Sequence, residues 1–448
     1  MSITVLNPGL LTTVQDLGRM GYQQFGVSVS GVMDPRAAAI GNILVGNPQG
    51  EAVLECTLMG PQLKFETDEV IAVTGGDLSP TLDGQPVPAY AALAVKAGQT
   101  LRFGAPKAGC RAYIAFAGGL DIPLVMGSRS TYMKAAIGGF EGRKLQNGDV
   151  LGLRAPVAGY ANLHQRAIAP EFVPRPVYTL RVVLGPQDDA FTPEGVATFL
   201  GSEYTVTNEF DRMGCRMDGP AIQHKNGGDI ISDGIAFGAI QVPGSGKPIL
   251  MGADRQTTGG YTKIATVISA DFRLLAQLKA GDKVRFEAVS VQAAQQALHF
   301  QRGALALLAT VDRVGSFVSK YYLVIVLLLV IVVCGAFWLA GRGFALHRLY
   351  FCLVLALGVV FCLVLPPYSA PDEQFHINQS FSVATTFTSR LPLNSVPLCD
   401  TYRRPTDVDP LLQDQNTTVF TWQEFADTLL TRSPDSAGDF QLYTEMQA

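Results

Sequence analysis

Hydrophobic residues gather in short runs through the first 300 residues of the chain, and turn-forming residues separate these runs. Each run is rich in Val, Ile, Leu, Tyr and Phe, as at 70–74, 91–95, 111–116, 177–184 and 283–288. Short apolar runs bounded by Gly, Pro, Asp or Asn predict β-strands. Because few helical patterns stand between them, they favour barrels or sandwiches. The predicted fold is mainly β, a β-rich α+β protein.

Three segments carry helical signals. Asp34 and Pro35 predict an N-cap and first turn for a helix that ends near Gly46. Thr192 and Pro193 predict a second helix to about residue 200, and a third is expected over 291–300. The proline-rich segment 155–176 reads as a connector. We therefore expect two β-rich halves, at 1–160 and 175–300.

The segment 230–261 combines glycine and proline with polar residues. It predicts strands at 230–231, 239–242 and 248–251, a turn at Pro243 and Gly244, and a polar loop over 254–260. Glycine lets the backbone bend sharply and approach a ligand closely. The loop supplies a carboxylate, a guanidinium, an amide and hydroxyl groups, so it is a candidate binding loop.

Composition changes near residue 310. Residues 321–340 carry no charge, and a second apolar run follows at 349–365. Twenty residues of helix span about 30 Å, the thickness of a bilayer core. We expect a linker at 301–320, transmembrane helices at 321–341 and 349–367, and an acidic polar tail at 368–448. A chain cut after Gly303 is expected to fold by itself.

Charge and cysteine content narrow the function. Basic and acidic side chains balance over residues 1–310, so nothing there predicts nucleic-acid binding. The net charge of −4 is the sum of +3 over residues 311–367 and −7 over the acidic tail at 368–448. The seven cysteines form no C-x-x-C pair, and the histidines lack metal-ligand spacing, so neither a disulfide framework nor a metal site is expected. Gly244-Ser-Gly-Lys247 lacks the residues of a phosphate loop.

Two polar clusters remain as candidate sites. Gln15, Asp16 and Arg19 stand in a glycine-punctuated turn, followed by Ser30 and Asp34 at a helix entrance. A helix N-terminus with nearby donors suits a carboxylate or another anion, although Asp34 can equally be a simple cap.

The second cluster is the run Asp211-Arg-Met-Gly-Cys-Arg216, which places two guanidiniums near a turn. They can hold a carboxylate or phosphate, or form solvated ion pairs with Asp211 or Asp218. Since Arg212 and Asp254 stand in polar loops, we expect their loss to reduce activity more than stability.

Several motifs together carry a family resemblance. They are Gln15-Asp-x-Gly-Arg19, Gly31 to Asp34, Gly127-Ser-Arg-Ser-Thr-Tyr132, Asp211-Arg-Met-Gly214, Gln241-Val-Pro, and Thr257-Thr-Gly-Gly-Tyr261. Over residues 1–295 the chain closely resembles the biotin-dependent carboxyltransferase family, also called allophanate hydrolase subunit 2, whose members include the C subunit of 5-oxoprolinase. The resemblance implies two cyclophilin-like β-barrel halves and a cytoplasmic location for this part of the chain.

The resemblance implies a component of an ATP-dependent 5-oxoprolinase, which opens pyroglutamate to glutamate, with ATP and Mg as cofactors. Its partners would be a protein like the B subunit of 5-oxoprolinase and a metal-dependent protein like the A subunit. Opening a lactam calls for cationic or amide donors around a developing oxyanion. The residues predicted to be catalytic are Arg212, Gln241, Asp254, Gln256 and Tyr261. Those predicted to bind substrate are Gln15, Asp16, Arg19, Ser30, Asp34, Ser232, Pro243, Gly246, Thr257 and Thr258.

Two other functions stay open. One is a carboxyltransferase or allophanate hydrolase-type domain that acts on urea-like substrates, with biotin on a separate carrier, since this chain has no biotin attachment site. The other is a regulatory protein that resembles the Kip antagonist.

The C-terminal part shows a different resemblance. Pro366-Pro-Tyr-Ser-Ala-Pro-Asp-Glu-x-x-His376 resembles the opening of an uncharacterised family of bacterial multi-span membrane proteins. The later spans of that family are missing here, so the tail is interpreted as a truncated fragment. We expect residues 321–367 to anchor the full-length chain in a membrane.

Overall fold

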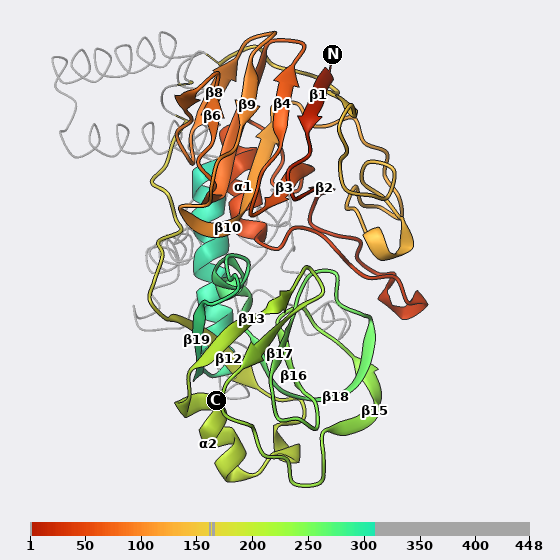
Figure 1. Ribbon diagram of the computed structural model, residues 1–448, viewed down its shortest axis with the longest axis vertical. Helices are drawn as coiled ribbons and strands as arrows, with labels where there is room; N and C mark the ends of the chain where they lie inside the picture. The colour runs from red at the N-terminus through yellow and green to blue at the C-terminus, as the bar shows by residue number, and fades with distance from the viewer. Residues whose placement is uncertain (1, 161–162, 164–165, 310–448) are drawn as a thin grey trace, which may run out of the picture. The chain divides into compact units, whose positions relative to one another are not determined.

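The computed structural model describes residues 2–160, 163 and 166–309. This part of the chain is mainly β, as the sequence predicts (Figure 1). Two sheets belong to the N-terminal half and one to the C-terminal half. The predicted spans at 321–341 and 349–367 and the tail at 368–448 lie outside the described residues.

The N-terminal half contains a six-stranded and a five-stranded sheet. The first has the order β11 (Val150–Gly152), β1 (Ser2–Asn7), β4 (Gln62–Phe65), β9 (Thr100–Arg102), β6 (Thr81–Leu82) and β7 (Gln85–Pro86). The second has the order β2 (Leu11–Gln15), β3 (Val53–Thr57), β10 (Ala108–Phe116), β5 (Glu69–Asp77) and β8 (Ala92–Val95). An apolar core formed by residues of both sheets, such as Ile3, Phe65, Ile114 and Phe116, holds this half together.

The C-terminal half is built on one eight-stranded sheet. Its order is β12 (Tyr178–Leu184), β19 (Lys283–Ala288), β13 (Tyr204–Phe210), β14 (Gly214–Asp218), β17 (Ile249–Met251), β16 (Ala239–Val242), β18 (Thr258–Val267) and β15 (Asp229–Gly234). Because β12 also pairs with β18, seven of these strands close into a ring, and β15 lies outside it on β18.

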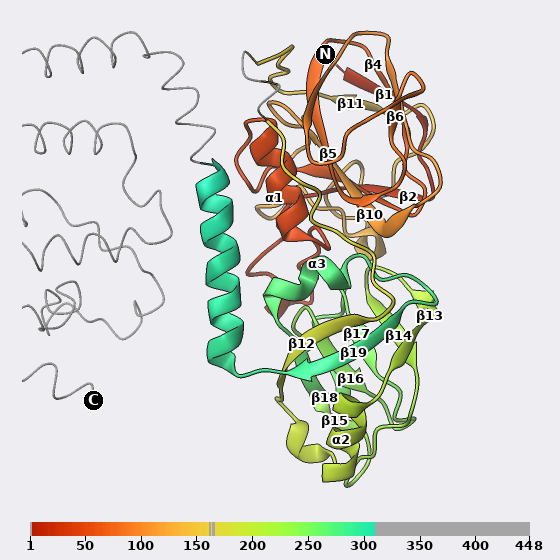
Figure 2. The same ribbon diagram turned by 90° about the vertical axis from the view of Figure 1, so that its left-hand side faces the viewer.

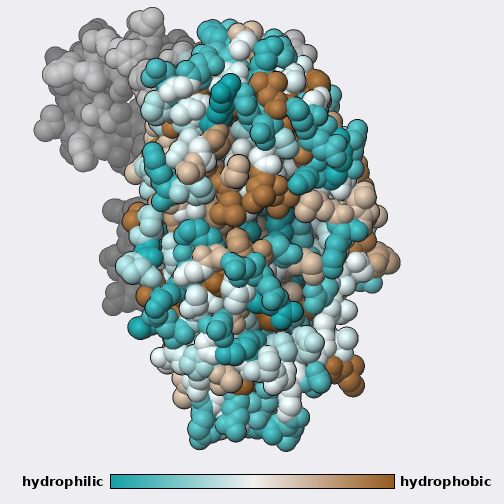
Figure 3. Space-filling view, viewed as in Figure 1, coloured by the Kyte–Doolittle hydropathy of each residue, from teal (hydrophilic) through white to brown (hydrophobic). Residues whose placement is uncertain are grey.

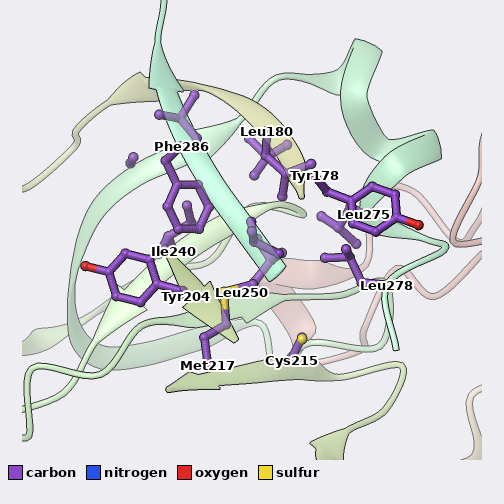
Figure 4. Packing of buried hydrophobic residues seen from close by; sticks show 14 of the residues in the cluster. Tyr178, Leu180, Tyr204, Cys215, Met217, Ile240, Leu250, Leu275, Leu278 and Phe286 are labelled. Atoms are coloured by element: carbon purple, nitrogen blue, oxygen red, sulfur yellow. The ribbon is translucent and has the colours of Figure 1, made fainter. Parts of the chain in front are cut away.

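Apolar side chains fill the interior of this ring (Figure 4). Tyr204 and Phe286 lie with ring centroids 5.8 Å apart, and Leu180 belongs to the same cluster. Met33, from the N-terminal half, is also a member of this cluster. The two halves therefore share part of one hydrophobic core.

Short helices accompany the sheets. The α-helices within the two halves are α1 (Pro35–Leu44), α2 (Pro193–Gly201) and α3 (Phe272–Leu275), and short 3-10 helices are η1 (Gln23–Phe25), η2 (Met133–Ala135), η4 (Asp188–Ala190) and η5 (Ser269–Asp271). The predicted N-caps are confirmed: Asp34 accepts from the backbone N–H groups of Arg36 and Ala37, and Thr192 accepts from that of Gly195.

The third predicted helix is longer than expected. It begins at residue 291 but continues to 309, so the first part of the predicted linker at 301–320 is helical. Figure 2 shows it in teal beside α1. Arg36 donates to the carbonyl of Gln301, and Leu305 and Leu308 pack against the apolar cluster around α1. These tertiary contacts extend the helix beyond the end that the local pattern indicates.

Strand predictions agree closely where apolar runs are bounded by turns. The runs at 239–242 and 283–288 match β16 and β19 residue for residue. The predicted polar loop at 254–260 is too long, because Thr258 already begins β18. Among the residues that the structure describes, no helix combines the length and apolarity needed to cross a membrane.

Candidate functional site

Arg212 links the two halves of the described chain. Its Nε donates to Asp254 at 2.9 Å, and its Nη2 donates to the carbonyl of Gly31 at 2.5 Å. Nη1 donates to the carboxylate of Glu55, on strand β3 of the N-terminal half. All three charged side chains are buried. Arg212 is therefore a buried connection between the halves and not the solvated ion pair considered from the sequence.

The carboxylates of Asp254 and Glu55 stabilise the charged form of Arg212. Burial by itself would lower the pKa of the guanidinium, but the carboxylates of Asp254 and Glu55 outweigh burial and raise this pKa above its ordinary value. Arg111 adds a second cation, with its Nε 4.0 Å from Glu55. The site at the junction of the halves thus contains a compact network of two arginines and two carboxylates.

Asp16 organises the loop that begins at Gly127. Its carboxylate accepts hydrogen bonds from the hydroxyls of Ser128 and Ser130 at 2.6 and 2.5 Å. It also accepts from the backbone N–H groups of Gly18 and Arg129. With four donors around it, this carboxylate holds two sequence motifs together.

Arg19 lies next to this loop and is fully buried. Its Nε donates to the carbonyl of Val125 and its Nη2 to that of Ser130, but Nη1 has no hydrogen-bond partner in the described structure. Burial lowers the pKa of the guanidinium, while Asp16 and Asp254 raise it. Gly138 permits this packing, since a Cβ there would lie 2.4 Å from Nη2.

The region around Arg19 contains two more buried polar atoms that have no hydrogen-bond partner among the described residues. Gln15 donates through Nε2 to Thr13 and to the carbonyl of Thr131, but its Oε1 accepts no hydrogen bond there. The hydroxyl of Ser30, whose backbone has a positive φ of 55°, is also unpartnered. Buried polar atoms are rarely left unpaired, so these groups form a candidate binding site.

Asp254 connects this region with the C-terminal half. It affects the pKa of Arg19, and it helps burial to raise the pKa of Tyr132. Ser28 donates to the carbonyl of Arg255, and Gln23 donates through Nε2 to that of Thr257. The polar loop at 254–257 is therefore fastened to the N-terminal half by several side chains.

A second group of predicted residues surrounds strands β16, β18 and β15. Gln241 is 1% exposed, and its Nε2 has no hydrogen-bond partner within the described ranges. Gln256, Thr258 and Ser232 are exposed, and Tyr261 is 41% exposed.

Other predicted residues lie elsewhere. Asp34 caps α1, and burial raises its pKa to about 6. Pro243 and Gly246 form a tight turn, in which the N–H of Gly246 donates to the carbonyl of Pro243. Arg216 is a surface residue that pairs with Glu209, so the two guanidiniums of the 211–216 run do not converge.

The sequence did not single out Glu55 or Lys263. Both are buried charged residues within strands, at 1% and 2% exposure. A charge inside an otherwise apolar run such as 53–57 is a usable signal, because a buried charge needs a partner. The identity of that partner depends on the tertiary structure.

Within the described ranges, no three or more His, Cys, Asp or Glu side chains lie together as metal ligands do. Lys247 pairs with Asp218 at 2.8 Å and donates to the carbonyl of Gly219. The Gly244 to Lys247 turn is thus not arranged to hold a phosphate chain. Cys56, Cys110 and Cys215 are buried free thiols, as expected for small apolar residues.

Comparison with known proteins identifies the family of this chain. A family model described as the carboxyltransferase domain, subdomain A and B, matches residues 25–288. The chain belongs to this carboxyltransferase family, as the sequence motifs predict. It is 40% identical to the C subunit of 5-oxoprolinase from Haemophilus influenzae over 293 residues, which cover 65% of this chain and 93% of that protein. It is 37% identical to the C subunit of 5-oxoprolinase from Escherichia coli over 302 residues, which cover 67% and 95%.

Larger proteins match over the same part of the chain. Urea amidolyase of Saccharomyces cerevisiae is 34% identical over 312 residues, which cover 66% of this chain and 17% of that protein. The crystal structure of the K. lactis urea amidolyase superimposes with a TM-score of 0.63 at 32% identity, covering 68% of this chain and 20% of that one. This chain therefore spans about a fifth of the urea amidolyase relatives.

Proposed function

We propose that this chain is a component of an ATP-dependent 5-oxoprolinase, which opens the pyroglutamate ring to glutamate. Relatives that are C subunits of 5-oxoprolinase match the chain over nearly their whole length, which supports this choice. Proteins like the A and B subunits of 5-oxoprolinase would be its partners.

The observation that carries the proposal is the buried donor set beside Asp254. Arg19 Nη1 and the Ser30 hydroxyl have no partner in the described structure, and both are buried. A carbonyl oxygen that gains negative charge during attack on an amide is stabilised by such preorganised donors. Arg212 and Glu55 would hold Asp254 and the loop at 254–257 in place, so they are proposed as positioning residues.

The proposal also gives roles to other residues that the sequence predicts for the site. Gln241 on β16, Tyr261 on β18 and Gln256 in the loop between β17 and β18 would contact substrate. Asp34, Pro243 and Gly246 have structural roles in the described fold, so they are omitted from the proposed site.

ATP is the energy source that the reaction requires. The described residues do not present a phosphate-binding loop at 244–247, since Lys247 is engaged by Asp218. No phosphoryl-transfer step is therefore assigned to residues of this chain, and ATP binding is left to the assembled complex.

The proposal is tested by reconstitution. The full-length chain, combined with proteins like the A and B subunits of 5-oxoprolinase, should release glutamate from 5-oxoproline only when ATP is present. Arg19→Lys should reduce kcat/KM at least tenfold, because the single nitrogen of lysine cannot bind the carbonyls of Val125 and Ser130 and also supply the donor that Nη1 presents. Arg216→Ala, at an exposed ion pair, is the matched control and should retain activity.

A second candidate function has its own support. The match to urea amidolyases favours a carboxyltransferase domain acting on a urea-like substrate, with biotin on a separate carrier. Biotin-dependent carboxylation of urea, without ATP-dependent release of glutamate from 5-oxoproline, would favour this alternative.

A further inference from the structure

Lys263 and Gln241 lie directly opposite each other on strands β18 and β16. Their side chains are 2% and 1% exposed. Directly opposed residues of an antiparallel pair project from the same face of a sheet. The ammonium and the carboxamide therefore share one side of the C-terminal sheet.

Both side chains end in donors that are poorly satisfied: Gln241 Nε2 has no acceptor in the described structure, and the ion pair with Asp233 is the one polar contact of Lys263 Nζ there. Buried polar groups are nearly always hydrogen-bonded, and buried charges are normally paired. The pair can therefore take a further acceptor, and the positive charge of Lys263 favours an anionic one.

The counter-ion beside this ammonium is weakly held. Lys263 Nζ lies 3.2 Å from a carboxylate oxygen of Asp233, whose side chain is 54% exposed. Asp233 belongs to β15, the strand outside the closed ring, and Gln187 also donates to it at 3.2 Å. Because Asp233 is half in water, a ligand carboxylate can replace it at modest cost.

Gly259 packs directly against the Gln241 carboxamide. A Cβ at this position would lie 2.8 Å from Gln241 Nε2 and 2.7 Å from Ile235 Cδ1, closer than side chains tolerate. The amide nitrogen of Gln256 lies 3.6 Å from the same point. Glycine is therefore required at position 259, next to the amide nitrogens of Gln241 and Gln256.

We infer that Lys263 and Gln241 bind the carboxylate of a small-molecule acid. The identity of the acid rests on the proposed function: 5-oxoproline carries a carboxylate beside its lactam nitrogen, whereas urea is neutral. This pair therefore selects acidic lactams over neutral amides. In the absence of ligand, Asp233 forms an ion pair with the Lys263 ammonium, and it competes with the ligand carboxylate for this ammonium.

Direct binding tests this inference. The full-length chain is titrated with 5-oxoproline, with acetate, and with 2-pyrrolidone, the same ring without a carboxylate. Expected results are binding of both acids and at least tenfold weaker binding of 2-pyrrolidone. Lys263→Met should weaken both acids at least tenfold, and Asp233→Asn should strengthen them at least threefold, because the competing carboxylate is gone.

Controls separate a lost site from a lost fold. Lys283→Met, at an exposed ion pair with Glu203, should bind as the parent chain does. A folded Lys263→Met variant that binds 5-oxoproline within twofold of the parent overturns the inference. If Lys263→Met does not fold, the Asp233→Asn variant is the test. Unchanged or weaker binding of both acids by that variant overturns the inference.

The two proposals fail in different ways. Lys263-dependent binding of acetate, without turnover of 5-oxoproline by the reconstituted complex, leaves the carboxylate site standing and refutes the proposed function. Turnover of 5-oxoproline with binding that is independent of Lys263 supports the proposed function and refutes the carboxylate site.

Discussion

Arg212, in the C-terminal half, forms a buried ion pair with Glu55, in the N-terminal half. The two side chains are 3% and 1% exposed and lie 157 positions apart in the sequence. The same guanidinium binds Asp254 through Nε and Nη2. This contact makes the junction between the halves dependent on buried charge.

The first prediction is that Arg212→Ala destabilises the protein strongly. The substitution leaves the Glu55 and Asp254 carboxylates buried without their cation, which costs about 3–5 kcal/mol when one partner of a buried pair is removed. Denaturant unfolding of the parent and variant chains measures this. This prediction differs from the expectation from sequence alone, that activity would fall with little loss of stability, because Arg212 is buried.

A matched variant separates charge from packing. Glu55→Gln keeps the shape but removes one carboxylate, so it should cost less than Arg212→Ala. Equal stability of Arg212→Ala and the parent chain would show that the network contributes nothing.

The second prediction concerns the pH dependence of stability. Glu69 is fully buried, its Oε2 has no hydrogen-bond partner in the described part of the chain, and burial raises its pKa to about 7. Because the folded-state pKa lies above the ordinary value of 4.5, the fold prefers the protonated carboxyl. Stability should fall as pH rises from about 4.5 to about 7, and the loss persists at higher pH.

Glu69→Gln removes this titration. The variant should match the parent at pH 4.5 and exceed it by up to about 3 kcal/mol at pH 8, from the size of the pKa shift. Unfolding of both proteins at the two pH values measures the difference. An advantage for the variant that is the same at both pH values would exclude Glu69 as the titrating group.

The third prediction concerns the helix over residues 291–309. A chain ending after Ala309 should fold cooperatively and be more stable than one ending after Gly303. Leu305 and Leu308 pack against the cluster around α1, and burial of such side chains is worth about 1–3 kcal/mol each. Thermal unfolding of the two truncated chains measures the difference. Equal melting temperatures would show that these contacts are unimportant.

The fourth prediction is that residues 310–448 do not contribute to activity. Their motifs belong to a different resemblance, so no physical reason couples them to the site at the junction of the halves. In the reconstituted complex, the chain ending after Ala309 should have the same specific activity as the full-length chain. A reproducible loss, with the partner proteins in excess, would show that the two parts act together.

The surface that Figure 3 displays is mainly hydrophilic with small apolar groups interspersed. This agrees with the even balance of charges over residues 1–310. The exposed apolar side chains of the described part include Met20, Phe25 of η1 and Met133 of η2.

The sequence by itself determined the local structure. Asp34 followed by proline specified a helix start, and apolar runs bounded by turns specified β16 and β19, because these signals depend only on neighbouring residues. The family motifs also indicated Gln15, Arg19 and Gln241, whose buried polar atoms lack partners in the described fold.

Only the tertiary structure decided which charges meet. Nothing near Glu55 in the sequence predicts Arg212 as its partner, and nothing near Gln241 predicts that Lys263 lies opposite it. The extension to residue 309 of the helix that begins at residue 291 likewise depends on contacts with the cluster around α1. Buried electrostatic pairs, and the pairing of strands such as β16 and β18 that are not consecutive in the sequence, depend on long-range packing, which local sequence patterns do not encode.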